Sequence, residues 1–198
     1  MKTLTIIKPD DLHLHLREGL VLKNIIQFTS EYFGRAIVMP NTKSPITSIN
    51  SAISYKKSIV EALPESSKFE PLMTIYLTDE TDKKELIKGF KDKVFFAAKL
   101  YPANATTNSN YGVKKIKNLY EIFESMQDHG IPLLIHGEVS DPEVDIFPYH
   151  NRQYHPLHVQ HLDGIQYSAQ WVCVDHASNV LFQAIYNVDV GQVDQRQG

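Results

Sequence analysis

Apolar segments alternate with amphipathic segments along the first 136 residues of the chain. The short apolar runs, which predict strands, are residues 4–7, 12–16, 36–39, 72–77, 94–100 and 132–135. Apolar residues recur at helical spacing in residues 20–33, 48–63, 82–90 and 113–129. Ser48 is a typical helix cap, and Gly130 followed by Pro132 is a helix stop. This alternation predicts an α/β fold of βα units around a parallel sheet, with five units by residue 136 when the strand at 12–16 is the first.

Residues able to bind metal lie on the strand at 12–16. Side chains two positions apart share a strand face, so His13, His15 and Arg17 are expected on one face and the leucines at 12, 14 and 16 on the other. Two imidazoles on one face can reach a single metal ion. A polar strand face that simply meets solvent is the alternative for so short a motif.

Three further polar residues stand at the ends of predicted strands. Asn41 follows the strand at 36–39, where an ordinary turn is the alternative. Lys99 lies in an otherwise apolar run. A buried lysine loses its proton readily, and the neutral amine can then combine with CO2 to form a carbamate. The alternative is a lysine whose side chain reaches out to water. His136 closes the strand at 132–135, and a hydrogen-bonded core histidine is its alternative reading.

Taken together, these positions favour a metal site. All of them fall at the carboxyl ends of predicted strands, which is the catalytic end of a (βα)8 barrel. Three histidines and a lysine carbamate suit a binuclear zinc centre better than a mononuclear one.

The overall composition excludes several classes of protein. A net charge of −3 over 198 residues lacks the basic surface of a nucleic-acid binder. Cys173 is the single cysteine, which excludes an intramolecular disulfide and a cysteine-built zinc cluster, and we expect it to be a buried, inert thiol. No apolar run is long enough to span a bilayer, and the start lacks a signal-peptide stretch, so a cytoplasmic protein is expected.

Composition changes sharply near Phe147. Residues 1–147 hold 16 Lys and 11 Glu, whereas residues 148–198 hold neither but have 5 of the 9 His and 8 of the 10 Gln. We therefore predict a front part at 1–147 and a divergent tail at 148–198, produced by a change of coding frame or parent gene. A terminal subdomain with a different surface is the alternative.

Four stretches of the front part resemble the dihydroorotase family, specifically its short monofunctional bacterial type within the amidohydrolase superfamily. They are residues 11–17 (DLHLHLR), 39–42 (MPNT), 99–109 (KLYPANATTNS) and 134–139 (LIHGEV). The third is distinctive enough to separate the chain from hydantoinase and allantoinase relatives. The resemblance covers residues 1–147, and the tail does not share it.

The resemblance implies a (βα)8 (TIM) barrel of the metal-dependent hydrolase type and two Zn²⁺ ions per subunit. His13 and His15 would bind the more buried zinc, N-carboxylated Lys99 would bridge both ions, and His136 would bind the second. The small-molecule substrate would be held by Arg17, Asn41 and His136. The implied reaction is the reversible cyclisation of N-carbamoyl-L-aspartate to L-dihydroorotate in pyrimidine biosynthesis. The resemblance also allows a homodimer, and neither nucleic acid nor membrane is an expected partner.

The chain departs from the family after Phe147. The family continues through three more strands that carry another zinc-binding histidine and then an acid/base aspartate. A complete barrel takes about 250 residues, so we expect an incomplete barrel of about five βα units without that aspartate, which leaves the catalytic acid/base unassigned. Residues 171–178 (WVCVDHAS) are similar to the family's next metal-binding strand and would offer His176, although coincidence in a histidine-rich tail is favoured. The tail histidines expected in a solvated loop are His155, His158 and His161.

Three functions therefore remain open. The first is a dihydroorotase, and the second is a truncated, non-catalytic remnant of one that retains partial zinc binding. The third is another cyclic-amide hydrolase of the superfamily, against which the stretch at 99–109 argues.

Overall fold

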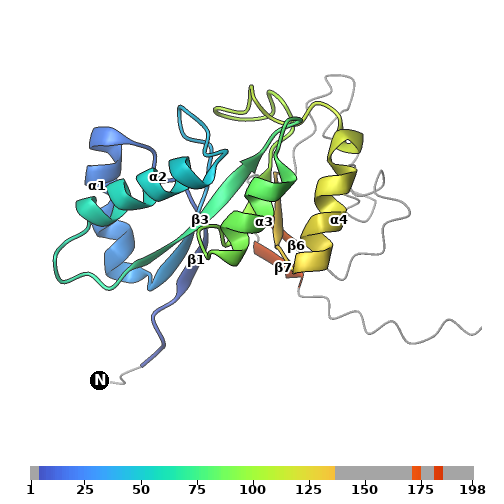
Figure 1. The fold of residues 1–198 in the computed structure, drawn as a ribbon. Helices are drawn as coiled ribbons and strands as arrows, with labels where there is room; N and C mark the ends of the chain where they lie inside the picture. The colour runs from blue at the N-terminus through green and yellow to red at the C-terminus, as the bar shows by residue number, and fades with distance from the viewer. Residues whose placement is uncertain (1–4, 137–170, 175–180, 185–198) are drawn as a thin grey trace, which may run out of the picture.

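Strands and helices alternate along the computed structural model, which describes residues 5–136, 171–174 and 181–184 (Figure 1). The elements are β1 (Asp10–Leu14), α1 (Gly19–Tyr32), β2 (Arg35–Val38), α2 (Ile49–Ala62), β3 (Glu70–Leu77), α3 (Lys83–Lys91), β4 (Ala97–Leu100), the 3-10 helix η1 (Ile116–Leu119), α4 (Tyr120–His129), β5 (Leu133–His136), β6 (Trp171–Val174) and β7 (Leu181–Ala184). The four predicted helices and the five strands from residue 12 to residue 136 are thus confirmed as elements, but the predicted helix at 113–129 starts as the 3-10 helix η1 and is α-helical only from Tyr120.

The predicted strand at 4–7 is wrong over its described residues. Residues 5–9 form no strand, and the side chains of Ile6 and Ile7 are 71% and 94% exposed. Pro9 has no amide hydrogen to donate to a neighbouring strand, and pairing with β2 begins only at Asp10.

The strands form one curved sheet in chain order, from β1 to β7. Neighbours from β1 to β6 are parallel, and β7 runs antiparallel to β6. Sequential parallel strands joined through helices are the arrangement of a (βα)8 barrel, of which the described residues form a part. The sequence favours a chance similarity between residues 171–178 and the family's next strand. In the structure, Trp171–Val174 nevertheless pairs with β5 as the next parallel strand. Asp175 and His176 lie outside the described residues, as do the three histidines at 155, 158 and 161.

Apolar side chains pack on both faces of the sheet. The larger core lies under the helices and includes Ile26 of α1, Ile59 of α2, Leu86 of α3 and Phe123 of α4. On the opposite face, which we call the inner face, a small buried cluster comprises Ile37, Met39, Ala97 and Leu134. The helices therefore cover one face (Figure 1), and the inner face is left for other side chains.

Local sequence explains where the helices begin and end. The Ser48 hydroxyl accepts a hydrogen bond from the Ser51 amide, and the Ser51 hydroxyl accepts one from the Ser48 amide, so the start of α2 is capped in both directions. Asp82 caps α3 by accepting from the Lys84 amide at 2.8 Å. Gly130 ends α4 with a φ of +65°, a conformation that glycine adopts without steric cost.

An irregularity in β1 changes one prediction. Asp11 pairs with Ala36 and Leu14 with Val38, so β1 has one residue more than β2 between these pairs. Leu12 consequently packs against the inner-face cluster, whereas Leu14 and Leu16 pack under the helices. The expectation that all three leucines share a face is wrong, because the extra residue interrupts the two-residue alternation.

Candidate metal centre

His13 and His15 come together at the end of β1. Their Nε2 atoms lie 3.1 Å apart and their ring centroids 5.0 Å apart. Both side chains are partly buried, so the alternative of a freely solvated strand face does not describe them. Two nitrogens bound to one tetrahedral zinc would lie about 3.3 Å apart, given zinc–nitrogen bonds of roughly 2.0–2.1 Å. The pair is therefore spaced as two ligands of one ion.

Lys99 and His136 occupy the neighbouring strands β4 and β5. Lys99 is 0% exposed, so its side chain does not reach water as the alternative reading required. His136, the last residue of β5, is 3% exposed. Alternation along each strand places Lys99 on the face of Ala97 and His136 on the face of Leu134, which is the inner face.

Two tyrosines share this face with the lysine and the histidine. Tyr101 follows β4 and stacks on Tyr76 of β3, with ring centroids 5.0 Å apart and an angle of 26° between the planes. Its ring also lies 5.7 Å from the His136 ring, and Lys99 Nζ lies 5.3 Å from its centroid. Burial raises the pKa of Tyr101 above its usual value, as does nearby Tyr76, and Arg17 opposes the shift. Sequence reasoning missed Tyr101, although its position two residues after Lys99 would have placed both side chains on one face.

Arg17 and Asn41 meet at the carboxyl ends of β1 and β2. Arg17 Nη1 donates to the Asn41 carbonyl at 3.2 Å, and the Tyr55 hydroxyl donates to the Arg17 carbonyl at 2.6 Å. The φ of Arg17 is +59°, which is uncommon for a side-chain-bearing residue and is held here by these contacts. Asn41 is only 2% exposed and is thus more than a surface turn residue.

The polar loop at 101–112 closes over Asn41 and Tyr76. Asn41 Nδ2 donates to the Thr107 carbonyl at 2.9 Å, and Asn108 Nδ2 donates to the Asn41 carbonyl at 3.0 Å. The Tyr76 hydroxyl donates to the Asn108 carbonyl at 3.2 Å. The tip of this loop therefore rests on Asn41 and Tyr76.

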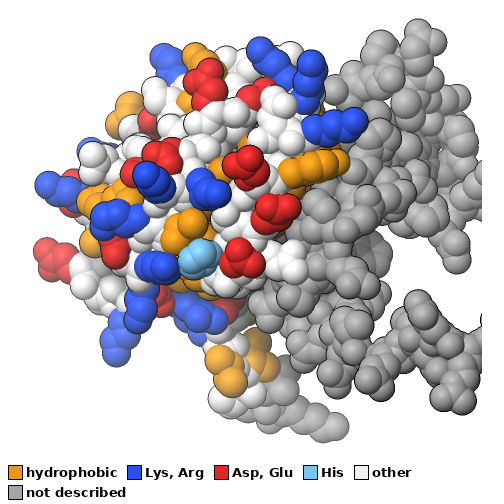
Figure 2. Space-filling view, turned by 45° about the vertical axis from the view of Figure 1, so that its right-hand side comes forward, with side chains coloured by type: hydrophobic (Ala, Val, Ile, Leu, Met, Phe, Trp, Pro, Cys, Tyr) orange, Lys and Arg blue, Asp and Glu red, His pale blue; other side chains and the backbone are white. Residues whose placement is uncertain are grey.

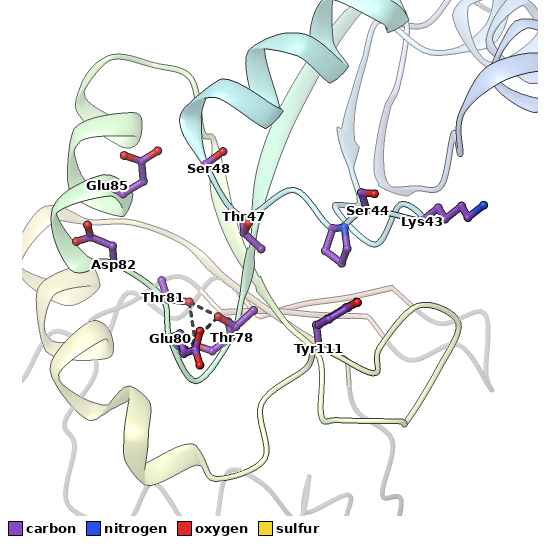
Figure 3. Close-up of a pocket in the computed structure, with 11 residues that line it drawn as sticks. Lys43, Ser44, Thr47, Ser48, Thr78, Glu80, Thr81, Asp82, Glu85 and Tyr111 are labelled. Carbon is purple, nitrogen blue, oxygen red and sulfur yellow. Dashed lines mark hydrogen bonds between the residues drawn. The ribbon is translucent and has the colours of Figure 1, made fainter.

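A cavity of about 580 Å³ lies beside this region and not within it (Figure 3). Its walls come from the segments that lead into α2 and α3 and from Tyr111 of the loop, and they are rich in hydroxyl and carboxylate groups. None of the three histidines or Lys99 lines it. The cavity is therefore separate from the candidate metal ligands.

The described residues fit a metal centre only if the lysine takes part. Within residues 5–136, 171–174 and 181–184, no three His, Cys, Asp or Glu side chains gather into a ready cation site. His13 and His15 supply two nitrogens, and an ammonium or neutral amine at Lys99 would not add an anionic ligand. A carbamate at Lys99 would add one with two oxygens, which is the donor chemistry that the arrangement calls for.

Charged side chains of both signs lie on the surface of the described residues. On the face shown in Figure 2, basic and acidic side chains are interspersed and form no basic stripe. Among the described residues, none of the helices has the length and apolarity needed to cross a bilayer.

Comparisons with known proteins indicate the family of the chain. The model of the Amidohydrolase family matches residues 2–186. The dihydroorotase of Cronobacter sakazakii (strain ATCC BAA-894) is 56% identical over 146 residues, which are 74% of this chain and 42% of that protein. The chain thus spans less than half the length of this curated relative, while the family match continues beyond Phe147 and through β6.

Solved structures give the same relationship. A dihydroorotase from Campylobacter jejuni matches with a TM-score of 0.62 and 39% identity, over 68% of this chain and 39% of that one. A dihydroorotase from Saccharomyces cerevisiae in complex with 5-fluoroorotic acid matches with a TM-score of 0.62 and 30% identity, over 69% of this chain and 38% of that one. The resemblance to dihydroorotases is confirmed, and so is an α/β fold of the barrel type. The chain belongs to the amidohydrolase family.

Proposed function

We propose that this chain carries the front part of a zinc-dependent dihydroorotase site, for the reversible cyclisation of N-carbamoyl-L-aspartate to L-dihydroorotate. The proposal rests on the paired His13 and His15 nitrogens, 3.1 Å apart, together with the burial of Lys99 and His136 on the inner face of β4 and β5. Dihydroorotases are also the relatives that the comparisons return. The proposed enzyme acts in the cytoplasm in pyrimidine biosynthesis.

The proposed metal ligands are the four residues named from the sequence. His13 and His15 would hold one Zn²⁺, His136 the second, and Lys99 both. To do so, the neutral Lys99 amine forms an N–C bond to CO2 and releases its proton, and one C=O electron pair moves onto oxygen to give the carbamate. Bound zinc would supply Lewis acidity for the amide carbonyl and make hydroxide available near neutral pH.

Arg17 and Asn41 are the proposed substrate-binding residues. The Arg17 guanidinium has a fork of donors that suits a carboxylate. Asn41 Oδ1 has no hydrogen-bond partner among the described residues, although Asn41 is nearly fully buried. Asn41 Nδ2 holds the loop at Thr107, so Asn41 can contact the substrate and the loop tip together. His136 is the third proposed substrate-binding residue.

Zinc content and turnover should be measured on the same purified full chain. We expect two zinc ions per chain and formation of L-dihydroorotate from N-carbamoyl-L-aspartate. Lys99→Met should lower the zinc content to one ion or less and abolish product formation. Lys23→Met, on the exposed side of α1, removes a surface lysine and should change neither result. Full turnover by Lys99→Met would contradict the proposal.

A second candidate follows from the changed composition after Phe147. The chain would then be a non-catalytic product that binds zinc in part, and bound zinc without turnover would favour it. The division into 1–147 and a divergent tail at 148–198 also stays a proposal, with His176 as the candidate for the next zinc ligand. Translation of the coding DNA after residue 147 in all three frames would test that division, because a frame change would reveal family sequence in another frame.

A further inference from the structure

Tyr101 lies beside two of the four candidate metal residues, Lys99 and His136. It is 1% exposed, stacked on Tyr76 and tilted against His136, with Lys99 Nζ 5.3 Å from its ring centroid. That separation lies within the range in which an aromatic face attracts a cation. The ring thus offers a partner to Lys99 while the lysine is unmodified and charged.

The hydroxyl of Tyr101 differs in its hydrogen bonding from the hydroxyls of two other buried tyrosines. Tyr76 donates to the Asn108 carbonyl at 3.2 Å, and Tyr55 donates to the Arg17 carbonyl at 2.6 Å. Tyr101 Oη is fully enclosed and has no hydrogen-bond partner among the described residues. Buried hydroxyls are nearly always paired, and leaving one unpaired is destabilising. This hydroxyl therefore indicates an acceptor that arrives after folding.

We propose that Tyr101 is a positioning residue whose hydroxyl donates a hydrogen bond to the N-carboxylated form of Lys99. The inference rests on the proposed function, which supplies the carbamate. Carboxylation gives Lys99 an anionic group with two acceptor oxygens, and Lys99 Nζ already lies 5.3 Å from the centroid of the ring. A hydrogen bond to an anionic oxygen is stronger than one between neutral groups, so it favours the modified lysine and fixes the plane of the carbamate.

The test compares Tyr101→Phe with wild type and with Tyr76→Phe. Both substitutions remove one hydroxyl and keep the ring, but the Tyr76 hydroxyl is bound to the loop. Each protein is stripped of metal and reloaded with zinc over a series of ¹³C-bicarbonate concentrations. The carbamate is followed by its ¹³C NMR signal, and bound zinc is measured by metal analysis.

Tyr101→Phe should need about ten-fold more bicarbonate than wild type for half-maximal carboxylation, since a hydrogen bond to a charged group is lost. Tyr76→Phe should behave like wild type in this measurement. In the metal-free state, Tyr101→Phe should melt at or above the wild-type temperature, because it removes an unpaired hydroxyl. That result also separates a positioning role from a purely structural one.

Three outcomes would overturn the inference. The first is an unchanged bicarbonate dependence in Tyr101→Phe. The second is the same unchanged bicarbonate dependence in Tyr101→Phe together with a raised KM for N-carbamoyl-L-aspartate, which would show that the Tyr101 hydroxyl binds the substrate instead. The third is an equal loss of melting temperature with and without metal. If wild type itself gives no bicarbonate-dependent carbamate signal, the proposed function fails first, and the two failures are thereby distinguished.

Discussion

Gly112 closes the neck of the polar loop, and its replacement by alanine should disturb the strand end that carries Lys99. A Cβ added at Gly112 would lie 2.5 Å from the Tyr101 carbonyl oxygen, 2.9 Å from the Ser109 carbonyl oxygen and 3.0 Å from the Ala103 amide nitrogen. All three are backbone atoms, so no side chain can rotate away to make room. The neck must therefore open.

The size of the effect follows from these distances. Raising the contact with the Tyr101 carbonyl from 2.5 Å to the 3.0 Å that real Cβ atoms respect requires a backbone shift of at least 0.5 Å. The same neck holds two hydrogen bonds, Val113 N to Tyr101 O at 2.8 Å and Ala103 N to Val113 O at 3.0 Å. Weakening both costs about 1–3 kcal/mol. Alanine also lowers the conformational entropy of the unfolded chain, which stabilises the folded state by about 0.4–1 kcal/mol. We expect Gly112→Ala to lower the free energy of unfolding by about 1–2 kcal/mol.

Gly34→Ala is the matched control. Its added Cβ would approach nothing closer than the Lys8 carbonyl oxygen at 3.7 Å, which is ordinary contact, and its φ is not left-handed. This variant should gain up to about 1 kcal/mol through the unfolded state. Urea unfolding of the metal-free chain, followed by circular dichroism at 222 nm, measures both variants. The reasoning is refuted if Gly112→Ala is as stable as Gly34→Ala.

Two further predictions concern the inner face of the sheet. Leu134 is 1% exposed, and Leu134→Ala should lower the free energy of unfolding by about 2–5 kcal/mol in the same urea assay. Leu20 is 77% exposed and serves as the control. Leu20→Ala should change the free energy of unfolding by less than about 0.5 kcal/mol. Burial raises the pKa of Tyr76 from 10.0 to about 12, so between those pH values the unfolded chain loses a proton that the folded chain keeps, and stability falls as the pH rises. Tyr76→Phe should be about 1 kcal/mol less stable than wild type at pH 9 through its lost hydrogen bond. It should then gain about 2 kcal/mol relative to wild type by pH 12. A stability difference that does not change with pH would contradict this.

The elements of the fold could be predicted because their sequences are locally consistent. The cap at Ser48 and the stop at Gly130 coincide with real helix ends, and the apolar run before His136 is a real strand. The failure at residues 4–7 has a different origin. An apolar run specifies a strand only where another strand is available to pair with it, and pairing of β1 with β2 begins at Asp10.

The candidate site was predictable where it depends on strand periodicity alone. Lys99 and His136 lie on the inner face because β4 and β5 are regular. The β1 irregularity broke the alternation for Leu12, since an extra residue in one strand is a property of the pair and not of either sequence. The contact of the loop tip with Asn41 joins residues 66 positions apart, and no local pattern encodes it.

The division of the sheet into two faces explains how the chain can bury a lysine and still fold. Among the residues that the structure describes, the larger apolar core lies between the strands and the four helices, whereas the buried apolar cluster of the inner face has four members. Next to those four, the same face carries Thr74, Tyr76, Lys99 and His136, all nearly inaccessible. Burying such groups is costly unless each finds a partner. The stability of the fold must therefore come mainly from the helix-covered face, while Thr74 and Tyr76 of the inner face are paired through hydrogen bonds to the Val38 and Asn108 carbonyls.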